Sequence, residues 1–151
     1  MAQSYPAIPD SVPVARRELA AFAAGLGASE EQVEAVRLAA SEAITNVVMH
    51  AYPGDRGEVH LRADLAAGEL WVLIADDGVG LRAHSESPGL GVGLALIAQS
   101  ADGLTIMTRA DGGTEVRMRF ELEEKAGGGQ DALGSRSSAT SPAFPRFSTT
   151  A

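Results

Sequence analysis

The chain has 151 residues, a formal net charge of −8 and no cysteine. This length is typical of one domain with a short extension, and the lack of thiols excludes disulfides, thiolate zinc sites and cysteine nucleophiles. The acidic balance argues against broad binding to nucleic-acid phosphates, which needs clustered Lys and Arg. Lys125 is the only lysine, so the ordered part lacks the lysine that a P-loop or a eukaryotic-type protein kinase places on phosphates.

Apolar residues make up 45% of the sequence but occur in short runs. No run approaches the twenty residues that a membrane-spanning helix needs, and the first ten residues do not have the charged-then-apolar pattern of a signal peptide. We therefore expect a cytoplasmic protein without a membrane partner.

Two helices are predicted in the first third of the chain. Asp10 or Ser11 can cap a helix through residues 12–27, which glycines close. Residues 29–32, "SEEQ", have the form of a capping box and start a second helix that reaches about His50. Along that second helix one apolar stripe contains Val33, Val36, Ala40, Ala43, Val47 and Ala51.

Strands are predicted after the second helix. Residues 58–65 alternate apolar and polar side chains, and residues 69–75 form a more fully buried neighbour in an antiparallel hairpin. A glycine-bearing loop and a short helix over residues 92–100 come next. Residues 103–109 and 114–122 then form a second hairpin around a turn. The sides expected to be buried carry Val59, Leu61, Ala63 and Leu65 in the first hairpin and Val116, Met118, Phe120 and Leu122 in the second.

This order of elements predicts an α+β fold, a two-layer α/β sandwich in which helices cover one face of a mixed, mainly antiparallel sheet. The folded domain is expected over residues 1–125. Residues 126–151 are rich in Gly, Ser and Pro without a period, and we expect them to form a disordered tail because they can bury too little apolar surface.

Three polar side chains recur at four-residue intervals on the second predicted helix: Glu42, Asn46 and His50. This spacing places them along one side of the helix, and Glu42 and Asn46 lie well away from the apolar stripe. The helix therefore presents a packing face and a polar face. Taken alone, Glu42 is better explained as a solvated surface charge.

Three further motifs follow in order. A D-x-G-x-G sequence over residues 76–80 ends a buried strand, where glycines allow close approach of a ligand. A G-x-G-x-G sequence over residues 89–93 opens an apolar helix whose free amide groups and positive dipole end can receive phosphate oxygens. Gly113 and Thr114 begin the last strand. Each of the first two motifs by itself is more often an ordinary turn than a ligand site.

As an ordered set, these motifs resemble those of the GHKL ATPases, the superfamily of gyrase, histidine kinases and mismatch-repair proteins. Residues 42–52 resemble the N box, residues 76–80 the G1 box and residues 89–93 the G2 box. Gly113-Thr114 resembles the last glycine-threonine element of that set. The version is most similar to bacterial anti-sigma-factor serine/threonine kinases of the sporulation and general-stress type. The likeness spans roughly residues 5 to 123.

The resemblance implies a role for each motif residue. Asn46 would hold Mg²⁺ through its side-chain oxygen, and Glu42 would be the general base. Asp76 would accept a hydrogen bond from the adenine amino group, with Thr114 nearby, whereas His50 would pack near the site. The glycines of the ATP site would be Gly78 and Gly80 at the base and sugar, and Gly89, Gly91 and Gly93 at the phosphates.

The same resemblance implies a regulator that binds ATP and Mg²⁺, phosphorylates a Ser or Thr on an anti-anti-sigma (STAS-type) partner, sequesters a sigma factor and forms a homodimer, without contacting nucleic acid directly. Between Gly80 and Gly89 the lid is short and Arg82 is its only basic residue. Two alternatives therefore stay open: a nucleotide-dependent partner-switching module without kinase activity, and a detached histidine-kinase-like catalytic domain. His60 and His84 look isolated, and neither receives a metal role.

Overall fold

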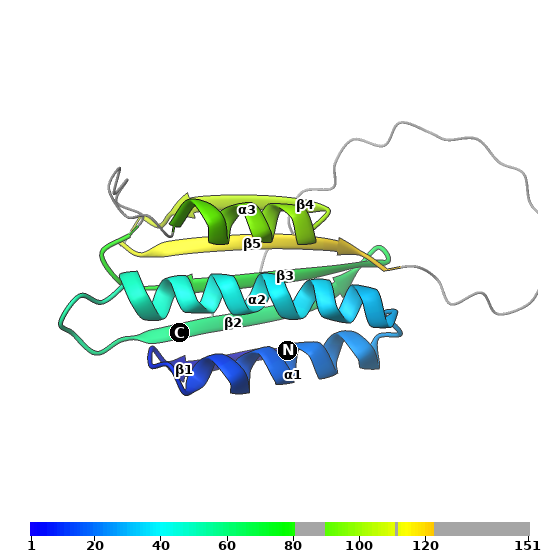
Figure 1. Cartoon of the computed structure of the whole chain (residues 1–151), viewed down its shortest axis with the longest axis horizontal. Coiled ribbons are helices and arrows are strands. Elements are labelled where there is room, and N and C mark those ends of the chain that lie inside the picture. The colour runs from blue at the N-terminus through cyan, green and yellow to red at the C-terminus, as the bar shows by residue number, and fades with distance from the viewer. Residues whose placement is uncertain (81–89, 111, 123–151) are drawn as a thin grey trace, which may run out of the picture.

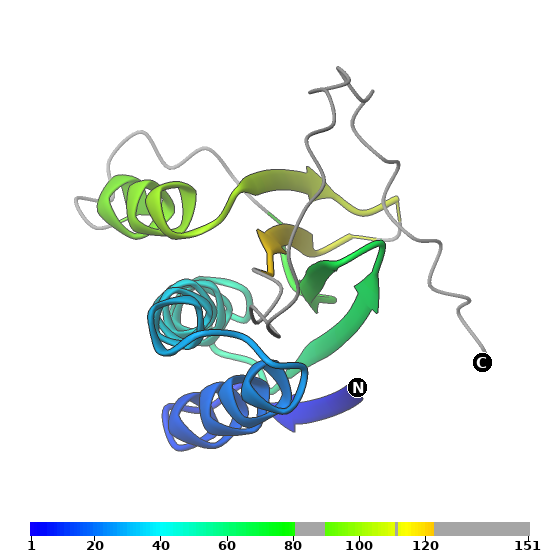
Figure 2. The same ribbon diagram turned by 90° about the vertical axis from the view of Figure 1, so that its right-hand side faces the viewer.

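The computed structural model describes residues 1–80, 90–110 and 112–122. In this part of the chain, three helices cover one face of a five-stranded antiparallel sheet with the order β1-β2-β3-β5-β4 (Figures 1 and 2). The predicted two-layer α+β sandwich is confirmed. Every strand pair in the described sheet is antiparallel, so the expected mixed character has no counterpart there. The predicted tail, residues 126–151, lies outside the described residues.

The first two helices form where the sequence predicts them. Helix α1 spans Ser11–Gly25, and Asp10 precedes it without a side-chain capping bond. Helix α2 spans Glu30–His50 and begins with the predicted capping box. In that box the Gln32 amide donates to Ser29 Oγ at 3.2 Å, and the Ser29 amide donates to Gln32 Oε1 at 2.9 Å. Two of the otherwise unpaired amides at the helix start are thereby satisfied.

The apolar stripe of α2 packs into the core as predicted, with Val33 only partly buried. Ala39 and Ile44 widen the buried face. Helix α3, Leu90–Ser100, begins two residues before its predicted start, and Figure 2 shows α2 lying between α1 and α3 on the same side of the sheet. Among the described helices, none is long and apolar enough to cross a membrane.

Two predicted hairpins make up most of the sheet. Strand β2, Glu58–Ala66, pairs with β3, Glu69–Asp76, and β4, Gly103–Thr108, pairs with β5, Thr114–Glu121. Strand β5 also pairs with β3, which joins the two hairpins into one sheet. Leu65 was expected on the buried side of β2, but it is 43% exposed, one residue before the end of the strand at the β2–β3 turn.

A fifth strand was not predicted. Strand β1, Ala2–Pro6, lies at the sheet edge and pairs with β2, so that Ser4 is opposite His60. Its five residues show no apolar alternation and are mostly exposed, which leaves no local signal. The strand forms because a segment more than fifty positions away offers unpaired backbone groups along its edge.

Candidate functional site

The predicted polar face of α2 meets the beginning of α3. Gly93 is buried, and a methyl group at this position would lie 2.9 Å from Glu42 Oε2 and 3.7 Å from Asn46 Oδ1. A side chain at this position would therefore displace the Glu42 carboxylate, and glycine leaves both polar side chains in place beside α3. The structure brings together Glu42, Asn46 and the glycine-rich start of α3, as the motif order predicts, and we call this region the phosphate end.

Neither the Glu42 carboxylate nor the Asn46 amide has a hydrogen-bond partner within the described part of the chain, and both residues are partly exposed. The described residues also hold no group of three His, Cys, Asp or Glu side chains that could bind a metal. Beside Asn46, the described residues thus leave the other ligand positions of a divalent ion to phosphate oxygens and water. That ligand set suits Mg²⁺, so the residues present fit a Mg²⁺ nucleotide.

A buried carboxylate lies at the other end of the site, which we call the base end; both names follow the ligand contacts that the resemblance implies. Asp76 ends β3 and is 2% exposed. Its Oδ1 accepts the Gly78 amide at 2.9 Å, and its carboxylate also accepts the Thr114 amide. Burial nevertheless raises the pKa of Asp76 above the ordinary aspartate value. The two oxygens of a carboxylate can accept about four hydrogen bonds. The Asp76 carboxylate can therefore accept a further hydrogen bond from a ligand.

Close backbone contacts shape the base end. A methyl group on Gly78 would lie 2.1 Å from the Ala51 carbonyl oxygen, and one on Gly113 would lie 2.0 Å from the Asp76 carbonyl oxygen. Gly113 also has a φ of +81°, which strains other residues. Gly78 and Gly113 thus allow the end of α2, the loop after β3 and the start of β5 to meet. A methyl group on Gly80 would lie 3.4 Å from the Gly113 carbonyl oxygen.

The two ends lie along one stretch of α2. Glu42 and Ala51 are nine residues apart, which corresponds to about 13 Å along a helix axis. Glu42 faces α3 near the helix middle, whereas Ala51 contacts Gly78 at the helix end. An elongated ligand that reaches from Asp76 to Glu42 would therefore follow the second half of α2.

Three side chains at the base end were not predicted to act there. Arg109 donates to the Asp76 carbonyl oxygen at 3.0 Å and forms an ion pair with Asp77. His60 Nε2 lies 2.8 Å from the other Asp77 oxygen, and the Tyr52 hydroxyl accepts the Asp77 amide at 2.9 Å. The interpretation of His60 as isolated is wrong, because antiparallel pairing brings β2 beside the end of β3. The hairpin register was the signal that could have revealed this contact.

The remaining predicted residues are placed as follows. His50 is exposed in the last turn of α2, where a cation is favourable. Gly91 lies in the first turn of α3, and the chain around Gly89 and His84 lies outside the described residues.

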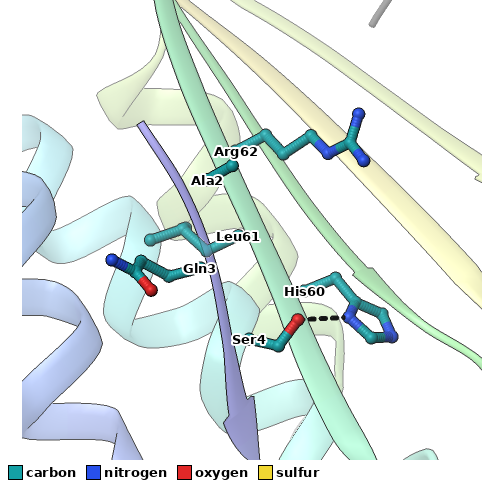
Figure 3. Close-up of a pocket in the computed structure, with 6 residues that line it drawn as sticks. All are labelled: Ala2, Gln3, Ser4, His60, Leu61 and Arg62. Carbon is teal, nitrogen blue, oxygen red and sulfur yellow. Dashed lines mark hydrogen bonds between the residues drawn. The ribbon is translucent and has the colours of Figure 1, made fainter. Parts of the chain in front are cut away.

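A polar pocket lies on strands β1 and β2 (Figure 3). Its volume is about 300 Å³, and no motif residue lines it. Ser4 Oγ and His60 Nδ1 lie 2.9 Å apart in this pocket, so the His60 ring bridges Ser4 and Asp77 (Figure 3). The pocket therefore borders the base end from the strand side.

A comparison with protein families matches this arrangement to a known class. The model described as "Histidine kinase-like ATPase domain" matches residues 5–120. The chain belongs to this family of ATPase domains.

Two relatives narrow the class. The "Serine-protein kinase RsbW" of Bacillus licheniformis is 38% identical over 87 residues, which cover 57% of this chain and 54% of the relative. The "Anti-sigma F factor" of a Clostridium botulinum strain is 30% identical over 117 residues, which cover 70% of this chain and 82% of the relative. The chain thus spans about half the length of the first relative and most of the second. The resemblance to anti-sigma factors and serine-protein kinases is confirmed at the level of the family.

A solved structure supports the fold. The RsbU and RsbW domains of Rv1364c from Mycobacterium tuberculosis align with a TM-score of 0.61 and 23% sequence identity, covering 81% of this chain and 32% of that chain. At this identity the likeness concerns the fold.

Proposed function

We propose that this protein binds ATP with Mg²⁺ and, as a cytoplasmic anti-sigma regulator, phosphorylates a serine or threonine of an anti-anti-sigma (STAS-type) partner. Once released from that partner, it would hold a sigma factor. It would act as a homodimer without contacting nucleic acid. The observation that carries this proposal is that Glu42 and Asn46, which have no hydrogen-bond partner among the described residues, face Gly93 at the start of α3. The relatives named anti-sigma factor and serine-protein kinase support the same class.

Each residue has a distinct task in this proposal. Asp76 would accept the adenine amino hydrogen, and the glycines at 78 and 80 would let the backbone approach the base and sugar. Asn46 would bind the metal ion through Oδ1, and the amides around Gly91 and Gly93 would donate to phosphate oxygens. Mg²⁺, when bound, would neutralise charge that develops on the phosphates.

Glu42 would act as the general base. Its carboxylate would accept the proton of the partner's hydroxyl while that oxygen bonds to the γ-phosphorus, and ADP would leave with the electron pair of the broken bond. Glu42 lies one helical turn before Asn46 and contacts the same glycine position. A base on the metal-binding helix is thereby held at the phosphate end.

A decisive test follows labelled phosphate from ATP to a matched anti-anti-sigma protein. We expect acid-stable phosphoserine or phosphothreonine with the wild type, and a loss of about 100-fold or more with Glu42→Ala. Calorimetry should show that Glu42→Ala still binds ATP. Failure of the wild type to bind either ATP or ADP in the presence of Mg²⁺ would refute the proposal.

A second function, nucleotide-dependent partner switching without phosphotransfer, is favoured by one observation. The segment between Gly80 and Gly89 contains a single basic residue, whereas phosphoryl transfer normally uses cationic groups beyond one Mg²⁺. ATP binding without labelled product on any matched partner would select this function.

A further inference from the structure

The hydroxyl of Tyr52 joins two backbone segments beside the base end. It donates to the Glu58 carbonyl oxygen at 2.8 Å and accepts the Asp77 amide at 2.9 Å. Tyr52 follows directly after α2, whereas Asp77 directly follows Asp76. One side-chain oxygen therefore connects the end of the helix that carries Asn46 to the residue next to the buried carboxylate.

The Tyr52 ring has little freedom to move away from this position. A methyl group on Gly57 would lie 2.1 Å from two atoms of the ring, so the ring packs directly on the backbone of this glycine. The ring is also partly buried against the hydrophobic core. The absence of a side chain at position 57 is what allows the hydroxyl to reach both of its partners.

A second contact from the same segment holds the other side of the loop. The Ala51 carbonyl oxygen accepts the Val79 amide at 2.9 Å. Residues 51 and 52 thus hold the loop at Asp77 and at Val79, and Gly78 lies between these two points. Gly78 is also the residue whose amide donates to Asp76 Oδ1, so the carboxylate orientation depends on this pair of anchors.

The side chain of Asp77 does not duplicate the contact made by its amide. His60 and Arg109 bind the two carboxylate oxygens of Asp77 from the strand side of the loop. Within the described residues, the Asp77 amide has Tyr52 as its partner. Removing the Tyr52 hydroxyl would leave the Val79–Ala51 hydrogen bond as the remaining anchor of this pair, so the loop could tilt about that point relative to α2.

We propose that Tyr52 is a positioning residue for nucleotide binding, because its hydroxyl sets the place of Asp76 relative to the metal-binding helix. The inference rests on the proposed function, since it concerns the same adenine contact. Tyr52 does not touch the ligand in this scheme. Its effect should therefore appear in base selectivity and in the nucleotide concentration needed for half-maximal activity, with little effect on the rate at saturation.

The test compares ATP with inosine triphosphate, in which a carbonyl oxygen replaces the adenine amino group. Calorimetry on the full chain with Mg²⁺ should show about tenfold weaker ATP binding by Tyr52→Phe, as expected for a loosened charge-assisted hydrogen bond. Binding of inosine triphosphate should change less than about twofold, because it does not use that bond. The preference for ATP, which is the ratio of its affinity to that of inosine triphosphate, should therefore fall. The rate of phosphotransfer at saturating ATP should stay close to that of the wild type.

Two further variants separate positioning from general damage. Tyr5 is the other tyrosine of the chain, and its hydroxyl donates to Glu18 at 2.6 Å, outside the base end, so Tyr5→Phe should leave the preference unchanged. Gly57→Ala should displace the ring without removing the hydroxyl and should narrow the preference as Tyr52→Phe does. Thermal melting would confirm that each variant is folded.

The outcomes are distinct. The positioning role would be overturned if Tyr52→Phe weakened the binding of ATP and of inosine triphosphate equally. It would also be overturned if Tyr52→Phe and Tyr5→Phe had the same preference for ATP. Either result would leave the proposed function intact. A wild type that binds neither nucleotide would overturn the proposed function itself. Narrowed selectivity in both Tyr52→Phe and Gly57→Ala, with an unchanged rate at saturation, is the expected result.

Discussion

The two ends of the site differ in how much of their hydrogen bonding the protein completes by itself. At the base end, Asp76 is buried and accepts two backbone amides. At the phosphate end, Glu42 and Asn46 have no partner among the described residues. The base end is therefore built in advance by the fold, whereas the phosphate end holds polar groups whose partners would arrive with the ligand.

This difference has an energetic reason. A buried carboxylate without hydrogen bonds would be too costly, so the protein must satisfy Asp76 even without ligand. Glu42 and Asn46 remain in contact with water and carry no such penalty. Binding selectivity should consequently depend on the base end, and phosphotransfer should depend on the phosphate end.

The largest expected effect on ATP affinity tests the base end directly. Asp76→Ala should weaken ATP binding about 10- to 100-fold, the value of a hydrogen bond to a charged group. Its matched control is Asp77→Ala, which removes the neighbouring carboxylate but keeps the amide bonded to Tyr52. Calorimetry should show a much smaller effect for Asp77→Ala, and equal losses in the two variants would contradict the assignment of Asp76.

A somewhat smaller effect is expected at the phosphate end. Gly93→Ala would place a methyl group 2.9 Å from Glu42 Oε2, and the flexible carboxylate should move rather than the helix. Phosphotransfer should fall about tenfold through misplacement of the base, with a smaller change in ATP binding. Gly25→Ala is the control, because a methyl group there meets nothing within 4 Å. A larger change in ATP affinity than in phosphotransfer rate would contradict the assignment of phosphotransfer to the phosphate end.

A weaker effect should follow from pH. Burial raises the pKa of Asp76, and a protonated carboxyl is a poorer acceptor for the adenine amino group. The preference for ATP over inosine triphosphate should therefore decline several-fold as pH falls, starting above the range in which an ordinary aspartate titrates. Both nucleotides carry the same triphosphate group, so protonation of that group cancels in the ratio of their two affinities. A ratio independent of pH down to the ordinary aspartate range would count against this contact.

The same pKa shift has the opposite consequence for folding. Because the folded-state pKa of Asp76 lies above its unfolded value, its contribution to the free energy of unfolding is present at low pH. That contribution is lost as pH rises through the folded-state pKa. Above that pKa the nucleotide-free protein carries a destabilising charge at Asp76, which ligand binding would offset.

The smallest effect on the site is expected from a residue far from both ends. Ser29→Ala removes the Ser29 half of the capping box of α2 and should lower the free energy of unfolding by about 1 kcal/mol. The nucleotide affinities should stay within about twofold of the wild type, because the cap lies three turns before Glu42. Denaturant unfolding would check the free energy of unfolding, and calorimetry would check the nucleotide affinities. A loss of ATP affinity beyond twofold would show that ATP binding at the site depends on global stability.

Much of the site could be predicted because its elements are local. The four-residue spacing of Glu42 and Asn46 places them on one helix face whatever packs around it. The D-x-G-x-G turn follows a strand that is recognisable from its apolar run. The contacts of His60 and Arg109 with Asp77 could not be predicted in the same way, because they join residues 17 and 32 positions apart through strand pairing.

By itself, the sequence determined the helices, the two hairpins and the order of the motifs, since capping, periodicity and turn residues act over a few neighbouring positions. The tertiary structure alone decided that β1 joins the edge of the sheet, that Gly93 faces Glu42 and that Tyr52 binds the Asp77 amide. Such contacts depend on how distant segments pack, because a hydrogen bond or a close backbone approach is formed only when the whole core brings both partners into range.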